Sequence, residues 1–97
     1  MVFEEWLYGE LLGTDINFVT MQRNYYGVHL PTGEILVNNR YRGNKELFYE
    51  TILHEMVHHW DYNDRMTEKE VEECAFLLIE DDRYYDTIDY YVKEHHS

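Results

Sequence analysis

Hydrophobic residues recur at two spacings along the chain, and the change between them separates predicted helices from predicted strands. Over residues 3–12 they return every three or four positions, which predicts a short helix that Gly13 ends. The spacing then alternates in three short runs, at residues 16–20, 26–30 and 35–37. The last two runs flank Pro31 and Gly33, which suit a tight turn. We therefore expect a small three-stranded antiparallel sheet.

The second half of the chain returns to helical spacing. After a polar loop at residues 38–44, a helix is expected to begin near Lys45, and residues 61–66 form a polar connection. Thr67 and Glu70 have the spacing of a capping box, which predicts a third helix through Ile79, and a last amphipathic helix is expected over residues 84–92. The pattern thus predicts an α+β fold with an N-terminal helix, a small sheet, a central helix and one or two C-terminal helices.

Length and charge limit what this fold can do. The 97 residues are enough for one domain, residues 1–97, with its own core but without a separate substrate domain. The 20 acidic and 8 basic residues give a net charge of −12, which argues against direct nucleic-acid binding. Cys74, the single cysteine, is expected in the core, and with no signal peptide or membrane-spanning run we expect a cytoplasmic protein without a membrane partner. We expect the basic group Arg40, Arg42 and Lys45 to offset nearby carboxylates rather than to contact an acidic substrate.

The central helix carries the sequence His54-Glu55-Met56-Val57-His58, an H-E-x-x-H motif. Two histidines four residues apart lie on one face of a helix, so both imidazoles can bind one zinc ion. Glu55 lies about 100° around the helix from His54 and can act as a general base toward a metal-activated water. The motif predicts a zinc site with His54 and His58 as ligands and Glu55 as the catalytic base.

A catalytic zinc site usually has a third protein ligand, and here it must come from outside the motif. No glycine and histidine follow at the spacing of the longer H-E-x-x-H-x-x-G-x-x-H pattern, and His95 and His96 lie at a chain end where fraying is expected. The helix after Thr67 offers several carboxylates. Glu72 shares a face with apolar residues and lies opposite the motif in an antiparallel helix pair, so it is the expected ligand. Glu70 is the alternative, although it also fits the capping box.

Three segments together resemble the ImmA/IrrE-type zinc metallopeptidases. They are Ile35-Leu36-Val37-Asn38, residues 51–59 around the motif, and residues 70–78, so the resemblance spans roughly half the chain. It implies a minimal zincin-like domain of a phage or mobile-element type, in which Glu72 takes the place of the metal-binding glutamate and Phe76 that of an aromatic residue. A register shifted by two residues would make Glu70 the ligand. The motif helix also resembles that of SprT-like proteases, whose third histidine this chain lacks.

We therefore expect a zinc metallopeptidase with a His/His/Glu site that cleaves a protein or peptide, with a specific regulatory protein as the candidate substrate. Tyr62, Tyr84, Tyr85 and His59 are candidate donors to the oxyanion, and Asp61 could orient His58. One alternative is a non-catalytic zinc-containing protein that binds a basic partner through its acidic surface. Another is a helical interaction domain without metal, in which the motif is accidental.

Overall fold

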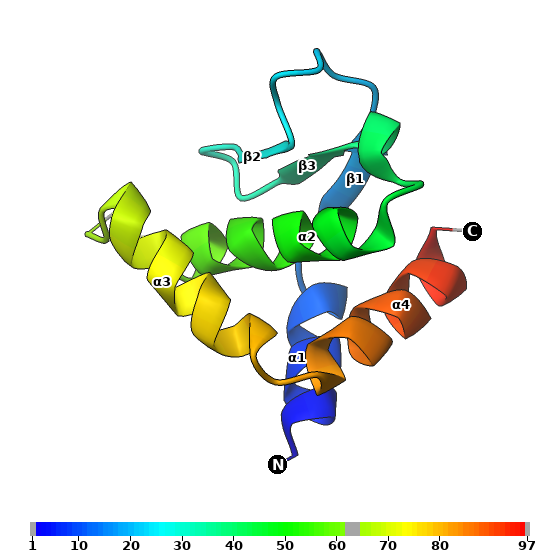
Figure 1. Ribbon diagram of the computed structural model, residues 1–97, viewed down its shortest axis with the longest axis vertical. Coiled ribbons are helices and arrows are strands. Elements are labelled where there is room, and N and C mark those ends of the chain that lie inside the picture. Colours follow the sequence, from blue (N-terminus) through cyan, green and yellow to red (C-terminus); the bar gives the residue numbers. More distant parts are fainter. Residues whose placement is uncertain (1, 62–64, 97) are drawn as a thin grey trace.

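The computed structural model describes residues 2–61 and 65–96, which form four α-helices and a three-stranded sheet. Helix α2 runs through the middle, with the sheet on one side and helices α1 and α4 on the other, while α3 runs obliquely beside α2 (Figure 1). The predicted α+β class is confirmed. The elements are α1 (Phe3–Leu12), β1 (Ile16–Val19), β2 (Gly27–His29), β3 (Ile35–Asn38), the short 3-10 helix η1 (Asn39–Tyr41), α2 (Lys45–Trp60), α3 (Glu68–Ile79) and α4 (Arg83–His95).

The sheet is mixed, so the prediction of an antiparallel sheet is wrong for one of its two strand pairs. Its order is β1-β3-β2. Strands β2 and β3 form the expected antiparallel hairpin, whose turn contains Gly33 at a φ of 92° that favours glycine. Strand β1, however, pairs in parallel with β3, with Ile16 opposite Ile35. The central strand is therefore the last one in sequence, and β2 lies at an edge.

Asn38, at the end of β3, explains this strand order. Its side chain is fully buried, and its amide nitrogen donates to the carbonyl oxygens of Gln22 and Tyr25 at 3.0 and 2.7 Å. Its amide oxygen accepts from the backbone N–H groups of Met21 and Arg40. These bonds hold the loop of residues 20–26 across the end of β3. The chain thus passes from one side of β3 to the other before β2 begins.

The core lies on both sides of α2. Phe48, Ile52, Leu53 and Met56 are at most 1% exposed and pack with residues of the sheet and of α1 and α4. A smaller cluster joins Val57 of α2 to two buried residues of α3, Val71 and Ala75, and partly buried Cys74 packs against it. Among the described residues, no helix has both the length and the apolar character needed to cross a membrane.

The basic group predicted near α2 does not act as one unit. Arg40 donates to the carbonyl of Met21, Arg42 donates to the carbonyl of His96, and Lys45 lies 3.5 Å from the carboxylate of Asp89. Only Lys45 therefore offsets a carboxylate as expected. The two arginines instead bind backbone oxygens of neighbouring segments.

Candidate metal centre

Helix α2 presents the two motif histidines side by side on one face. Asn44 caps the start of the helix by accepting from the backbone N–H of Leu47, and the helix continues without a break to Trp60. The ring centroids of His54 and His58 are 5.0 Å apart, and each side chain is 25% exposed. Both rings are thus accessible from solvent while their helix is firmly packed.

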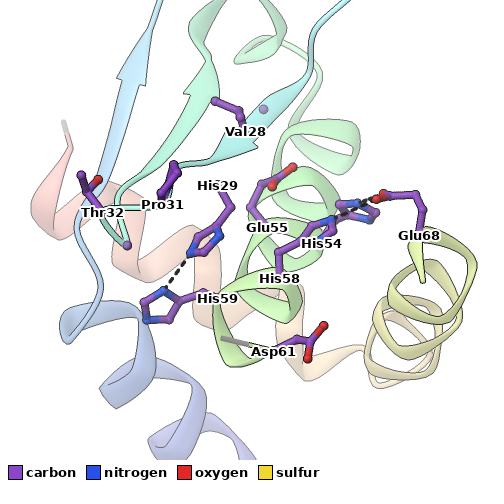
Figure 2. Close-up of a pocket in the computed structure, with 12 residues that line it drawn as sticks. Val28, His29, Pro31, Thr32, His54, Glu55, His58, His59, Asp61 and Glu68 are labelled. Carbon is purple, nitrogen blue, oxygen red and sulfur yellow. Dashed lines mark hydrogen bonds and ion pairs between the residues drawn. The ribbon is translucent and has the colours of Figure 1, made fainter. Parts of the chain in front are cut away.

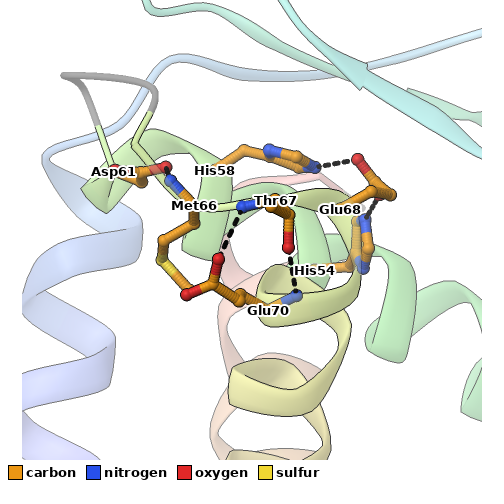
Figure 3. Close-up of polar contacts among 7 residues, drawn as sticks. All are labelled: His54, His58, Asp61, Met66, Thr67, Glu68 and Glu70. Carbon is orange, nitrogen blue, oxygen red and sulfur yellow. Dashed lines mark hydrogen bonds and ion pairs between the residues drawn. The ribbon is translucent and has the colours of Figure 1, made fainter.

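Glu68, the first residue of α3, meets both imidazoles. One carboxylate oxygen lies 2.9 Å from Nε2 of His54, and the other lies 3.4 Å from Nε2 of His58 (Figures 2 and 3). Partial burial by itself would raise the pKa of Glu68, but the hydrogen bond with His54 and the nearness of both rings outweigh it. The pKa of Glu68 is consequently lowered, which favours the ionised carboxylate that a metal ligand must be.

Two polar caps place Glu68 there (Figure 3). The carboxylate of Asp61, just beyond the end of α2, accepts from the backbone N–H of Met66 at 2.8 Å. Thr67 and Glu70 then form the predicted capping box, in which each side chain accepts from the backbone N–H of the other residue. The first turn of α3 is therefore held close to the end of α2, with Glu68 pointing toward the histidines.

The structure brings Glu68, rather than the expected Glu72, to the two histidines. Glu72 and Phe76 lie one turn apart on the same side of α3, but both are exposed, and the buried face of α3 is formed by Val71 and Ala75. Glu72 instead lines a neighbouring cavity further along α3. The alternative ligand, Glu70, is engaged in the capping box.

Glu55 lies buried beside the histidines, with only 7% of the residue exposed. Burial raises the pKa of its carboxyl group, and the nearby imidazoles of His54 and His58 only partly oppose this. A raised pKa suits a carboxylate that must accept a proton near neutral pH and release it again. Strand β2 packs directly against this side chain at Gly27, where an added Cβ would lie 3.3 Å from Cγ of Glu55 and 3.0 Å from the carbonyl oxygen of Leu36.

A second pair of histidines lies on the other side of the motif. Nε2 of His29 in β2 lies 3.3 Å from Nδ1 of His59 in α2, and the two rings pack edge to face (Figure 2). Desolvation, helped by His59 and His58, lowers the pKa of His29 and so favours its neutral form. With His54, Glu55, His58 and Glu68, this pair lines a cavity of about 750 Å³, which we call the site pocket.

His29 and Gly27 were not among the predicted site residues, although the sequence carries a signal for them. The hairpin around Gly33 pairs His29 with Ile35 and Gly27 with Val37. Directly paired residues lie on the same face of a sheet, so both face α2 together with the buried Ile35 and Val37. The alternating hydrophobic residues at 26, 28 and 30 lie on the opposite face of the strand, so His29 and Gly27 belong to the face that packs on α2.

The other predicted donors are distributed as follows. His59 lines the site pocket, whereas Tyr84 lies in the core and Tyr85 packs against Tyr49, so neither tyrosine lines it. Tyr62 lies outside the described residues. Asp61 lines the pocket but binds the backbone N–H groups of Arg65 and Met66 rather than the ring of His58.

The C-terminal histidines lie away from the motif histidines, and they contact tyrosines where fraying was expected. His95 and His96 are ordered by contacts with tyrosines: the ring of His95 lies 3.0 Å from the hydroxyl of Tyr8, and that of His96 lies 3.0 Å from the hydroxyl of Tyr91. Neither histidine lines the site pocket.

The residues at this site fit a zinc ion. One ligand atom from each of His54, His58 and Glu68 lies within 4.8 Å of the other two. Zinc in tetrahedral coordination binds imidazole nitrogen and carboxylate oxygen at about 2.0–2.2 Å, which places neighbouring ligand atoms about 3.3–3.6 Å apart. The separations of 2.9 and 3.4 Å from Glu68 to the two rings are close to that spacing. Small side-chain movements would therefore complete a site of three protein ligands.

Comparisons of the chain with protein-family models, curated proteins and solved structures find no match. The resemblance to ImmA/IrrE-type or SprT-like peptidases accordingly stays a prediction from the sequence. What the chain does is inferred from the site itself.

Proposed function

We propose that this protein is a zinc-dependent metallopeptidase in which His54, His58 and Glu68 hold the metal and Glu55 is the general base. The observation that carries the proposal is the convergence of these three ligand groups beside a buried glutamate in an open pocket. The chemistry of the donors agrees, because two imidazoles and one carboxylate make up the ligand set of many catalytic zinc sites. We also propose that the chain is an ImmA/IrrE-like peptidase and that its substrate is a specific regulatory protein.

Bound zinc would lower the pKa of a water molecule and polarise the carbonyl group of the scissile peptide bond. Glu55 would take a proton from the attacking water and deliver it to the departing amine nitrogen, for which its raised pKa is suited. His59, held by His29, is the candidate that lines the pocket and could donate to the developing oxyanion. Strand β2 is an edge strand that lines this pocket, so an extended peptide could pair with its outer edge.

The test begins with protein that is purified without chelators. Elemental analysis should find about one zinc per chain, as one His/His/Glu site requires. Cleavage of a proteome-derived peptide mixture, followed by mass spectrometry, should fall about 10²–10⁴-fold in Glu55→Gln, the usual contribution of a general base. Zinc content should be unchanged in this variant, because Glu55 is not a ligand.

Glu46→Gln is the matched control, since it removes the same charge from an exposed position of the same helix. It should leave both zinc content and cleavage unchanged. Stoichiometric zinc without cleavage of any peptide would contradict the catalytic proposal. It would favour the alternative of a zinc-containing protein that binds a basic partner through its acidic surface, for which the net charge of −12 is suitable.

A further inference from the structure

A second cavity opens directly beside the candidate metal centre. It has a volume of about 500 Å³ and lies between the loop before β2 and helices α2 and α3. Four residues line both this cavity and the site pocket: Gly27, His54, Glu55 and Glu68. We call it the side cavity. A peptide bound across the metal centre would therefore place one of its side chains at the entrance of the side cavity.

Two carboxylates line the side cavity beyond the metal centre, Glu50 from α2 and Glu72 from α3. Within the described ranges 2–61 and 65–96, neither side chain has a hydrogen bond or an ion pair, and no lysine or arginine lines the cavity. Burial, together with the nearby carboxylate of Glu46, raises the pKa of Glu50. A cation placed in this cavity would relieve that unfavourable charge.

Aromatic side chains supply the rest of the surface. Tyr25, Tyr26 and Phe76 line the side cavity although they are 50%, 52% and 60% exposed, respectively. The ring of Tyr26 is supported by an edge-to-face contact with Tyr41. Exposed aromatic faces of this kind bind the methylene groups of long side chains and attract cations.

We propose that the side cavity is a specificity subsite that accepts a lysine or arginine side chain of a peptide substrate, next to the bond that is cleaved. This inference rests on the proposed peptidase function and names its substrate class. The aliphatic part of the side chain packs between Tyr26 and Phe76, and its cationic end reaches Glu50 and Glu72. An acidic side chain is repelled by these carboxylates, and an apolar one leaves them desolvated without a partner. The net charge of −12 attracts basic segments to the molecule as a whole.

Small hydroxamates test this subsite without requiring cleavage, because the hydroxamate group binds the metal and the side chain samples the adjoining cavity. Calorimetry would measure the binding of Nα-acetyl-lysine hydroxamate, which keeps its side-chain ammonium group, to the zinc-loaded protein. The comparison is N-acetyl-norleucine hydroxamate, which has the same stem without the ammonium group. We expect the lysine compound to bind about tenfold more tightly, the effect of one charge-assisted hydrogen bond.

The double variant Glu50→Gln and Glu72→Gln should reduce this preference to about threefold or less, with little change for the norleucine compound. The control double variant Glu5→Gln and Glu73→Gln removes two charges from exposed positions of α1 and α3 that do not line the side cavity. It should keep the full preference. Equal binding of the two compounds, or a preference that survives in the Glu50/Glu72 variant, would overturn the proposal.

Acetohydroxamate, which has no side chain, separates this inference from the proposed function. It should bind the zinc-loaded protein and not the zinc-free protein. If it does so while the lysine preference is missing, the subsite proposal alone is wrong. If it fails to bind the zinc-loaded protein, the proposed metal function is wrong, and the subsite proposal is wrong with it.

Discussion

The two helices that form the candidate metal centre are held in the fold to very different extents. Helix α2 has eight buried residues and is covered by the sheet on one side and by α1 and α4 on the other (Figure 1). Helix α3 has two buried residues, Val71 and Ala75, and is fastened at its start by polar caps. The firmly packed helix supplies His54, Glu55 and His58, whereas the thinly packed helix supplies Glu68.

If the proposed site holds a metal, this difference couples metal binding to the docking of α3. Local opening is easiest where few apolar contacts must be broken, which here means α3 rather than α2. A metal that binds all three ligands stabilises the docked position of Glu68 by its binding free energy. We therefore expect changes in α2 to affect the stability of the whole protein, and changes in α3 to affect mainly zinc affinity.

Leu53→Ala should have the largest effect on stability. Leu53 is fully buried in α2, and truncation of such a leucine typically costs about 2–5 kcal/mol in the free energy of unfolding. Leu77→Ala is the matched control, because Leu77 of α3 is 67% exposed and its loss should cost less than about 0.5 kcal/mol. Urea unfolding of the zinc-free proteins measures both. Equal losses would contradict the proposed difference between the helices.

Gly27→Ala should have the next largest effect on stability. The added Cβ would lie 3.0 Å from both the carbonyl oxygen of Leu36 and Cγ2 of Thr51, and such overpacking costs about 1–3 kcal/mol. Because Glu55 also touches this position, peptide cleavage should fall more than zinc affinity. Gly9→Ala, in α1 with no atom within 4 Å of the new Cβ, should stabilise the protein by up to about 1 kcal/mol. A Gly27→Ala protein with unchanged stability and cleavage would show that β2 does not constrain α2.

Val71→Ala should have a smaller effect, confined to α3. The change removes two carbon atoms from a fully buried side chain. At about 0.8 kcal/mol for each carbon, it should lower the free energy of opening α3 by about 1.6 kcal/mol. Hydrogen exchange should become faster in α3 while α2 keeps its protection. Val19→Ala, at a position 36% exposed, is the control and should change neither helix. Equal acceleration in α2 and α3 would mean that the two helices open together.

Thr67→Ala should have the smallest effect on stability, about 1 kcal/mol, because it removes one helix cap. The loss should appear in zinc affinity, since the first turn of α3 carries Glu68. Competition with a zinc indicator should show weaker binding by about fivefold, the equivalent of about 1 kcal/mol. The exposed Thr20→Ala removes the same atoms and should leave affinity unchanged. Unchanged zinc affinity in Thr67→Ala would show that the helix cap does not position Glu68 for zinc binding.

The parts of the site that follow from local spacing could be predicted from the sequence. The four-residue interval between His54 and His58 and the three-residue interval between Thr67 and Glu70 each describe neighbours on one helix. Both arrangements have the predicted form in the structure. The start of α2 at Lys45 was also predictable, because the polar loop before it ends at the capping residue Asn44.

The parts that depend on how elements meet could not be predicted in the same way. The identity of the third ligand group depends on which face of α3 is buried. The sequence pattern placed Glu72 on that face, whereas the structure exposes it. Glu68 reaches the histidines from the first turn of α3, where side chains lean toward the helix start. The strand order likewise depends on Asn38, whose hydrogen bonds to the loop of residues 20–26 have no local signature.

We propose that Glu68 joins His54 and His58 as the third zinc ligand. Anomalous scattering at the zinc edge, from crystals grown with zinc and without chelators, tests it most directly. We predict one strong peak per chain, within bonding distance of Nε2 of both histidines and of a carboxylate oxygen of Glu68. A peak bound by Glu72 or Glu70 instead, or no peak at the motif histidines, would contradict the claim.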